Sequence, residues 1–183
     1  MKNKLFSEIP HMTGEKIEIR ALAQSDAQSL RKLTDDAETY RFLPSFLFEK
    51  KYENPKEVIR RLYDECIEGL LILGIFKGGD FCGLAELYDY RGDIRRVSAG
   101  IRLMSGFRGS GIAVQALELI EEYLRSETEI ETIAASSMSE NKASAAALKK
   151  CGFIMTNHKS PEDWGCGAPV PTDKWIKRIC CRG

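Results

Sequence analysis

The stretch LMSGFRGSGIA, from Leu103 to Ala113, decides the fold because it joins two different sequence patterns. It begins as the end of an apolar run, which predicts a strand over residues 94–103. After it, apolar residues recur every three or four positions to about residue 125, which predicts a helix. The glycines at the joint let the backbone approach a ligand closely, and a helix start offers unpaired N–H groups. The stretch therefore suits a phosphate or pyrophosphate, although an ordinary turn also fits the pattern.

The spelling of this stretch excludes two common phosphate-binding loops. It lacks the GxxxxGK[ST] pattern of a nucleoside-triphosphate loop, and no GxGxxG pattern opens the predicted helix, so a dinucleotide site is not expected. The pattern that it does contain is shorter and reads Arg108-x-x-Gly111-x-Ala113.

A second motif, ENKASAAALKKCGF at residues 140–153, follows the next predicted strand at 131–137. On a helix, Asn141 and Ser144 would share one face with Leu148. Two polar side chains followed by apolar ones suit a long, partly polar ligand. In the alternative interpretation, Asn141 or Ser139 only caps the helix, but a cap does not explain the polar residue at position 144.

The two motifs, in this order and with a strand between them, resemble those of the GNAT N-acetyltransferases, in the RimJ/RimL-like branch of ribosomal-protein N-terminal acetyltransferases. The resemblance runs from about residue 15 to the last predicted strand. It implies an α+β fold with a mixed, mostly antiparallel central sheet of about seven strands flanked by helices. It also implies that strands 94–103 and 131–137 splay apart and admit acetyl-CoA as the cosubstrate, without a metal.

The resemblance assigns roles to particular residues. The Leu103 backbone N–H would face the thioester as the oxyanion donor, and Ile101 and Met104 would flank the pantetheine arm. Asn141 would bind that arm, and the Ser144 hydroxyl would meet the departing sulfur. The pyrophosphate would lie on the loop that comprises Arg108, Gly109, Ser110, Gly111, Ile112 and Ala113.

The general base is harder to assign. Many relatives have a glutamate two residues before the glycine of strand 94–103, but this chain has Ser98 there, before Gly100. Glu86 is the alternative, because a carboxylate inside an apolar strand is desolvated and suits a proton acceptor. Glu86 could instead lie in solvent or pair with an arginine, and a water chain could serve in place of a single base.

The resemblance implies direct acetyl transfer to a primary amine. The first candidate acceptor is a protein or peptide N-terminal α-amine, which rests on the family branch alone. A small-molecule amine, such as a polyamine, an amino acid or an amino sugar, is the alternative. A non-catalytic acyl-CoA-binding module on the same fold is a further alternative, which only the serine at position 98 supports.

Length and composition limit the remaining possibilities. The chain has 183 residues, which predicts a single domain over 1–183 with residues 1–12 as a loose extension. It has 27 basic and 27 acidic residues, so no global charge favours nucleic acid. No apolar stretch indicates a membrane span or a signal peptide, so we expect a cytoplasmic protein with reduced cysteines. We expect it to be a monomer or a homodimer. The six cysteines form no CxxC pair and do not favour a zinc site.

The other segments complete the predicted order. Strands are expected at 15–22, 70–76, 81–90 and 153–156, with a final strand at 173–180. Helices are expected after a capping box at 25–28, from residue 54, and at 141–150. We expect a Gly- and Pro-rich loop over 157–172, containing His158, Asp163 and Trp164, to shape the acceptor side. An aromatic loop at 42–52 could form either a core flap or a wall of the acceptor pocket. Neither the exact role of the 157–172 loop nor that of Cys180 and Cys181 follows from the sequence.

Overall fold

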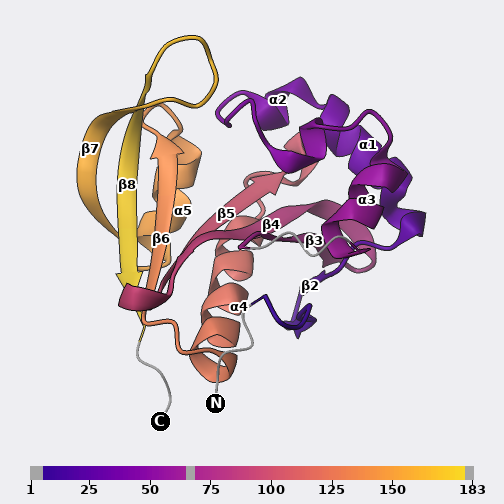
Figure 1. Ribbon diagram of the computed structural model, residues 1–183, viewed down its shortest axis with the longest axis horizontal. Helices are drawn as coiled ribbons and strands as arrows, with labels where there is room; N and C mark the ends of the chain where they lie inside the picture. Colours follow the sequence, from indigo (N-terminus) through magenta and orange to yellow (C-terminus); the bar gives the residue numbers. More distant parts are fainter. Residues whose placement is uncertain (1–5, 65–68, 180–183) are drawn as a thin grey trace.

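A computed structural model describes residues 6–64 and 69–179 of the chain (Figure 1). Cys66, Cys180 and Cys181 lie outside these residues. The strands are β1 (Met12–Thr13), β2 (Glu18–Arg20), β3 (Leu71–Lys77), β4 (Asp80–Arg91), β5 (Arg96–Leu103), β6 (Thr132–Met138), β7 (Ile154–Glu162) and β8 (Val170–Arg178). The α-helices are α1 (Ala27–Asp35), α2 (Ala37–Tyr40), α3 (Pro55–Asp64), α4 (Ile112–Glu127) and α5 (Lys142–Lys150). Short 3-10 turns include η2 (Phe48–Lys50).

One sheet organises the described residues, with eight strands in the order β1-β2-β3-β4-β5-β6-β8-β7. Among these described strands only the β5–β6 pair is parallel, and the other neighbours are antiparallel. This confirms the predicted α+β fold with a mixed, mostly antiparallel sheet. The strand count is one higher than expected because the short strand β1 pairs with β2, through Met12 opposite Ile19.

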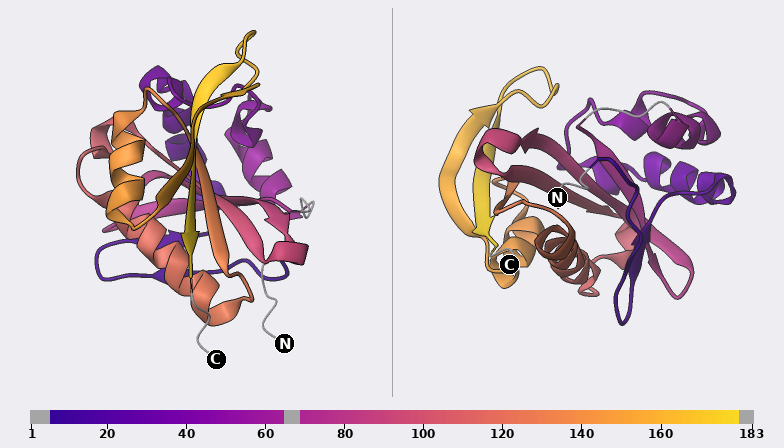
Figure 2. Two further views of the ribbon diagram at one scale, coloured as in Figure 1. Left: turned by 90° about the vertical axis from the view of Figure 1, so that its left-hand side faces the viewer. Right: turned by 60° about the horizontal axis from the view of Figure 1, so that its bottom comes forward.

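The two faces of the sheet bury different helices (Figure 2). Because side chains alternate along a strand, neighbouring residues of β4 lie on opposite faces. Ala85 belongs to the core that includes Ile120 of α4 and Leu148 of α5. Leu84 belongs to the core that includes Leu30 of α1 and Val58 of α3. The helices α4 and α5 therefore cover one face, and α1 and α3 cover the other.

Strands β5 and β6 splay apart, as the family resemblance implies. They pair from Arg96 opposite Thr132 only as far as Ser98 opposite Ala134. Beyond this point β5 stays paired with β4 up to Leu103, whereas β6 stays paired with β8 up to Met138. In Figure 1 the two strands meet at one end and diverge toward their arrowheads. The sheet is thus open in its middle. On one side of the opening β5 remains paired with β4, and on the other side β6 remains paired with β8, which we call the β6–β8 arm.

Two predicted local features are wrong. The expected loop over 157–172 is mostly strand, because β7 continues to Glu162 and only residues 163–169 connect it to β8. This edge strand is largely exposed and has irregular register, with Lys159 at φ 52°, so it shows no alternating hydrophobic pattern. The expected capping box at 25–28 is displaced, because the Ala23 N–H donates to Asp26 at 2.8 Å ahead of α1.

The other predicted elements are found within a few residues of their expected bounds. The start of α3 is confirmed, since the Asn54 side chain accepts a hydrogen bond from the Lys56 N–H at 3.0 Å and Pro55 is the first helical residue. Among the described residues, no helix is long and apolar enough to cross a membrane.

Candidate functional site

The β5–α4 loop forms one side of the opening between β5 and β6. Gly109 and Gly111 have φ values of 72° and 81°, a region that side chains strain to adopt, so the loop needs glycine at both positions. Added side-chain carbons at Gly106 and Gly109 would meet no atom within 4 Å, so the loop presents open backbone. Helix α4 begins directly after Gly111, and its first N–H groups have no intrahelical partner. The loop is therefore shaped to bind an anion with main-chain donors.

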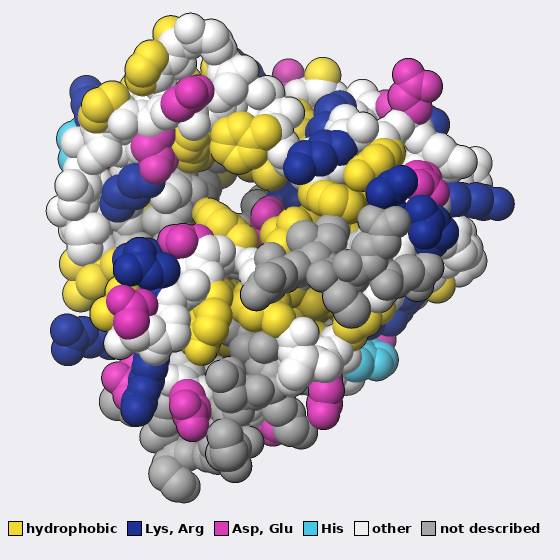
Figure 3. Space-filling view, in the orientation of Figure 1, with side chains coloured by type: hydrophobic (Ala, Val, Ile, Leu, Met, Phe, Trp, Pro, Cys, Tyr) yellow, Lys and Arg dark blue, Asp and Glu magenta, His cyan; other side chains and the backbone are white. Residues whose placement is uncertain are grey.

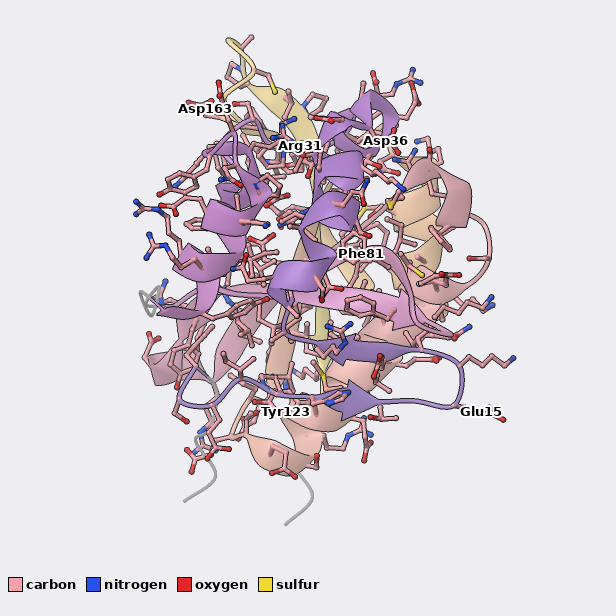
Figure 4. All side chains as sticks on the ribbon, turned by 90° about the vertical axis from the view of Figure 1, so that its right-hand side faces the viewer. Glu15, Arg31, Asp36, Phe81, Tyr123 and Asp163 are labelled. Carbon is pink, nitrogen blue, oxygen red and sulfur yellow. The ribbon has the colours of Figure 1, made fainter. Side chains whose placement is uncertain are left out.

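Asp36 fixes this loop to the α1–α2 corner (Figure 4). Its carboxylate accepts hydrogen bonds from the Ser105 N–H at 2.9 Å, the Thr39 hydroxyl at 2.9 Å and the Glu38 N–H at 3.1 Å. The bonds from Ser105, which contribute most, and those from Thr39 lower the pKa of Asp36 to about 2. The Arg108 guanidinium also donates to the Glu38 carbonyl at 2.6 Å. The Arg108 side chain therefore braces the loop against α2.

Backbone groups of β5 point into the opening. The Met104 N–H donates to the Cys82 carbonyl of β4 at 3.0 Å, so by alternation the N–H groups of Leu103 and Ile101 face away from β4 and toward the opening. The Thr132 N–H donates to the Arg95 carbonyl, so the N–H groups of later even-numbered residues of β6 face the opening from its other side. Polar backbone groups inside a sheet need partners, and an amide-bearing ligand between the strands would supply them.

Asn141 and Ser144 lie where β6 leads into α5, on the β6–β8 arm. Because parallel strands run in the same direction, this helix start and that of α4 lie at the same end of the sheet. The side-chain Oδ1 of Asn141 accepts a hydrogen bond from the Ser144 N–H at 3.1 Å and caps α5. Asn141 is therefore a helix cap, as in the alternative interpretation, while its side-chain NH₂ group is not used by the cap.

Glu86 lies on the opposite face of the sheet from α4 and α5. It projects from β4 opposite Gly100 and pairs with the guanidinium of Arg102. The same guanidinium holds Glu49 of η2, with Nε 2.6 Å from Oε1 and Nη2 donating to Oε2 at 2.8 Å. Burial by itself would lower the pKa of Arg102, but the charges of Glu49 and Glu86 raise it above its ordinary value. The arginine pair that the sequence left open as an alternative for Glu86 is therefore present.

The second wall of this face comes from β7 and β8. Lys174 of β8 pairs with Glu162 of β7 and donates to the Ser136 hydroxyl of β6 at 3.0 Å. The indole N–H of Trp164 donates to Glu162 at 2.9 Å, and the Trp164 side chain is buried. Although burial opposes ionisation, Lys174 and Trp164 lower the pKa of Glu162. Trp164 is thus a fixed part of this wall.

A contact between two loops closes the end of the opening. The Ser45 N–H donates to the Trp164 carbonyl, and the Ser45 hydroxyl donates to the Gly165 carbonyl, both at 2.9 Å. We call this contact between residues 41–47 and 163–169 the loop bridge. Figure 3 shows a hollow through the molecule between the β6–β8 arm and the α1–α3 side, rimmed largely by hydrophobic side chains. The loop bridge and the β5–β6 pairing thus lie at opposite ends of this opening.

Comparison with known proteins identifies the family. The model of the acetyltransferase (GNAT) domain family matches residues 16–154, which is most of the chain. This chain belongs to the GNAT acetyltransferase family. It is an N-acetyltransferase of the kind that uses acetyl-CoA as the acetyl donor. No curated protein matches its sequence.

Solved structures agree on the fold of this GNAT acetyltransferase. A Salmonella typhimurium acetyltransferase that modifies the N-terminal serine of ribosomal protein L7/L12 superposes with a TM-score of 0.77 at 18% identity, covering 93% of this chain and 99% of that one. Mycobacterium smegmatis RimJ in complex with CoA-disulfide gives 0.78 at 19% identity, covering 93% and 87%. Vibrio cholerae spermidine N-acetyltransferase with CoA and spermine gives 0.73 at 18% identity, covering 90% and 96%.

The predicted site residues of this GNAT acetyltransferase lie on both faces of the sheet. Ile101 packs against the core under α4 and α5, whereas Met104 packs against the core under α1 and α3. No role for Arg102, Glu49 or the loop bridge was predicted from the sequence. A charged residue within an apolar strand was the available signal for Arg102, because such residues are rarely buried without a partner. Its partner Glu49 lies on a distant turn, and the loop bridge joins residues far apart in the chain.

Proposed function

We propose that this GNAT acetyltransferase transfers the acetyl group of acetyl-CoA directly to a primary amine, with a protein or peptide N-terminal α-amine as the first candidate acceptor. The observation that carries the proposal is the opening between β5 and β6. The N–H groups of Ile101 and Leu103 face it, helix starts at Gly111 and Asn141 flank one side, and Glu86 lies on the other. Donor and acceptor can therefore approach from opposite faces and meet between the strands.

In the proposed reaction, acetyl-CoA places its pyrophosphate on residues 108–113 and its pantetheine arm between β5 and β6, beside Asn141. The acceptor ammonium loses a proton to Glu86, directly or through water. The amine nitrogen then attacks the thioester carbon, and the Leu103 N–H stabilises the oxyanion. Collapse of this intermediate breaks the carbon–sulfur bond. The attacking nitrogen releases its second proton as the amide forms. The CoA thiolate takes a proton from the Ser144 hydroxyl, which regains one from the nitrogen through water, and Glu86 gives its proton to solvent. The products are an amide and free CoA.

The charge balance of the acceptor side supports a single ammonium group over a polyamine. Glu162 is offset by Lys174, and the two carboxylates Glu49 and Glu86 share the one guanidinium of Arg102. These five groups leave one negative charge in excess. A peptide N-terminus brings one positive charge at this point, whereas a polyamine brings several and would gain from several unpaired carboxylates.

The test is an acetyl-transfer assay of the whole chain with acetyl-CoA. The acceptors are a peptide with a free N-terminal serine, the same peptide with a blocked N-terminus and an internal lysine, and spermidine. We expect acetylation of the free α-amine, measured as CoA release above hydrolysis and located by mass spectrometry. Faster acetylation of spermidine would favour the small-molecule alternative. CoA binding without transfer to any amine would contradict the enzymatic proposal.

A further inference from the structure

Gly100 occupies a special position at the point where the sheet splits. The last β5–β6 pair joins Ser98 to Ala134, and Gly100 is the next residue of β5 on the same face. It lies directly opposite Glu86, so both residues face the α1–α3 side of the sheet. Gly100 is partly exposed, whereas Ser98 and Arg102, its neighbours on this face of β5, are buried.

The missing side chain of Gly100 leaves free space beside two polar side chains. A carbon added there would lie 3.7 Å from Glu86 Oε2 and 3.8 Å from Tyr88 Cε1, which are ordinary contact distances. The backbone of Gly100 is outside the positive-φ region, so its conformation does not require glycine. Neither backbone strain nor crowding therefore requires glycine at this position. What the glycine does provide is the free space that a side chain would fill. We call this space, bounded by Gly100, Glu86 and Tyr88, the acceptor notch.

The negative charge in excess is exposed at the acceptor notch. The side chains of Glu49 and Arg102 are 0% and 3% exposed, and Glu49 uses both oxygens on the guanidinium and also accepts from the Tyr40 hydroxyl at 3.0 Å. Glu86 is the member with access to solvent, at 13% exposure. A partly buried carboxylate that shares its guanidinium with a second carboxylate is under-compensated. A cation in the notch would supply the missing positive charge.

Tyr88 completes the notch as a neutral aromatic wall. Burial, followed by the charge of Glu86, raises the pKa of Tyr88 to about 12, so its phenol carries no charge at neutral pH. An aromatic ring beside a carboxylate is favourable for an ammonium group, since the ring attracts a cation. Because an added carbon at Gly100 would already be in contact with both side chains, the space suits a primary ammonium better than a substituted one.

We propose that the acceptor notch binds the ammonium form of the acceptor amine, with Glu86 as its hydrogen-bond acceptor and Gly100 as the residue that sets its size. This assignment rests on the proposed acetyl transfer to an amine. It places the nitrogen on the face opposite α4 and α5, at the point where β5 and β6 separate. Gly100 then acts as a specificity-determining residue, because a single methyl group at this position occupies the space of the ammonium.

The test compares the wild-type chain with Gly100→Ala and with Ser98→Ala, a control on the same face where the strands are still paired. Gly100→Ala should raise the KM for the serine-terminated peptide or spermidine, whichever the wild-type chain acetylates, by about tenfold. The CoA affinity by calorimetry and the melting temperature should stay unchanged. Ser98→Ala should leave the acceptor KM within twofold. An unchanged acceptor KM in Gly100→Ala overturns the proposal.

A second measurement does not depend on turnover. Crystals of the CoA complex soaked in propylammonium chloride should show the ammonium nitrogen beside Glu86 in the wild-type chain and not in Gly100→Ala. Absence from the wild-type notch would overturn the assignment, even if acetyl transfer is observed. Conversely, an occupied notch in a chain that acetylates no amine would leave the notch standing and contradict the proposed function.

Discussion

The β5–α4 loop and the acceptor side of the sheet border the same opening, but they are built in different ways. The loop is one continuous stretch, 104–111, and its open glycines present backbone N–H groups. The acceptor side combines side chains from β4, β5, β7, β8 and η2, such as Glu86, Arg102 and Glu49. Backbone donors serve a group common to every reaction of this type, whereas an assembly of side chains can change with the acceptor. Substitutions in the loop should therefore weaken cosubstrate binding, whereas substitutions on the acceptor side should affect the acceptor and the chemical step.

The largest expected effect lies on the loop side. Gly111→Val places a β-branched residue at φ 81° and should distort the loop, so the CoA affinity should fall about 100-fold. Gly78→Val is the matched control, since Gly78 also has positive φ, at 59°, but lies in the β3–β4 turn with no atom near an added side chain. Calorimetry with CoA measures both. Equal losses would mean that general destabilisation, and not the loop, limits binding.

The next effect lies on the acceptor side. Glu86→Gln should lower kcat by about 10²-fold, the usual scale for general-base catalysis, with little change in CoA affinity. Glu162→Gln removes a carboxylate from the opposite wall and should change kcat much less. Rates at pH 6 to 9 provide the measurement. The same kcat in Glu86→Gln and the wild-type chain would remove Glu86 from the mechanism.

Asn141 allows the cap to be separated from cofactor binding. Asn141→Ala removes both the cap and the amide NH₂ group, whereas Asn141→Asp keeps a good capping oxygen in the same place and replaces the NH₂ group by an oxygen that cannot donate. If the amide binds the pantetheine arm, both variants should raise the KM for acetyl-CoA about tenfold. A raised KM in Asn141→Ala alone would assign the residue to the cap only.

Ser144→Ala tests the chemistry on the same helix. A hydroxyl that protonates the leaving sulfur acts mainly in the transition state, so kcat should fall several-fold while the KM for acetyl-CoA changes little. Single-turnover rates are the appropriate readout, since slow product release would hide the effect in steady state. If the single-turnover rate of Ser144→Ala equalled that of the wild-type chain with every acceptor, the hydroxyl would have only a structural role.

The smallest effect concerns the loop bridge. A side-chain carbon at Gly165 would lie 2.1 Å from the Ser45 hydroxyl, whereas one at Gly167 meets no atom within 4 Å, and both glycines have positive φ. Gly165→Val should therefore separate the loops and raise the KM for the acceptor a few-fold, with the KM for acetyl-CoA unchanged. Gly167→Val carries a similar backbone strain and should leave both values close to those of the wild-type chain.

The difference between the two sides also explains what the sequence could predict. Local backbone features, such as the glycines before α4 and the Asn54-Pro55 start of α3, are properties of neighbouring residues and can be identified by spelling. The pairing of Arg102 with Glu49 depends on how a turn 53 residues away folds over the sheet. The extent of β7 was missed for a related reason, because an exposed and irregular edge strand lacks the periodicity on which strand prediction depends.

The short parallel pairing of β5 and β6 has a consequence for how the protein exchanges its amide hydrogens with solvent. In a fully paired sheet, interior amides exchange only when the structure opens. Here the N–H groups of Ile101 and Leu103, deep in the middle of the sheet, face an opening and have no pairing strand beside them. They should exchange quickly in the free protein and slowly once a ligand lies between the strands. Hydrogen exchange at these two amides should thus report whether the cosubstrate is bound.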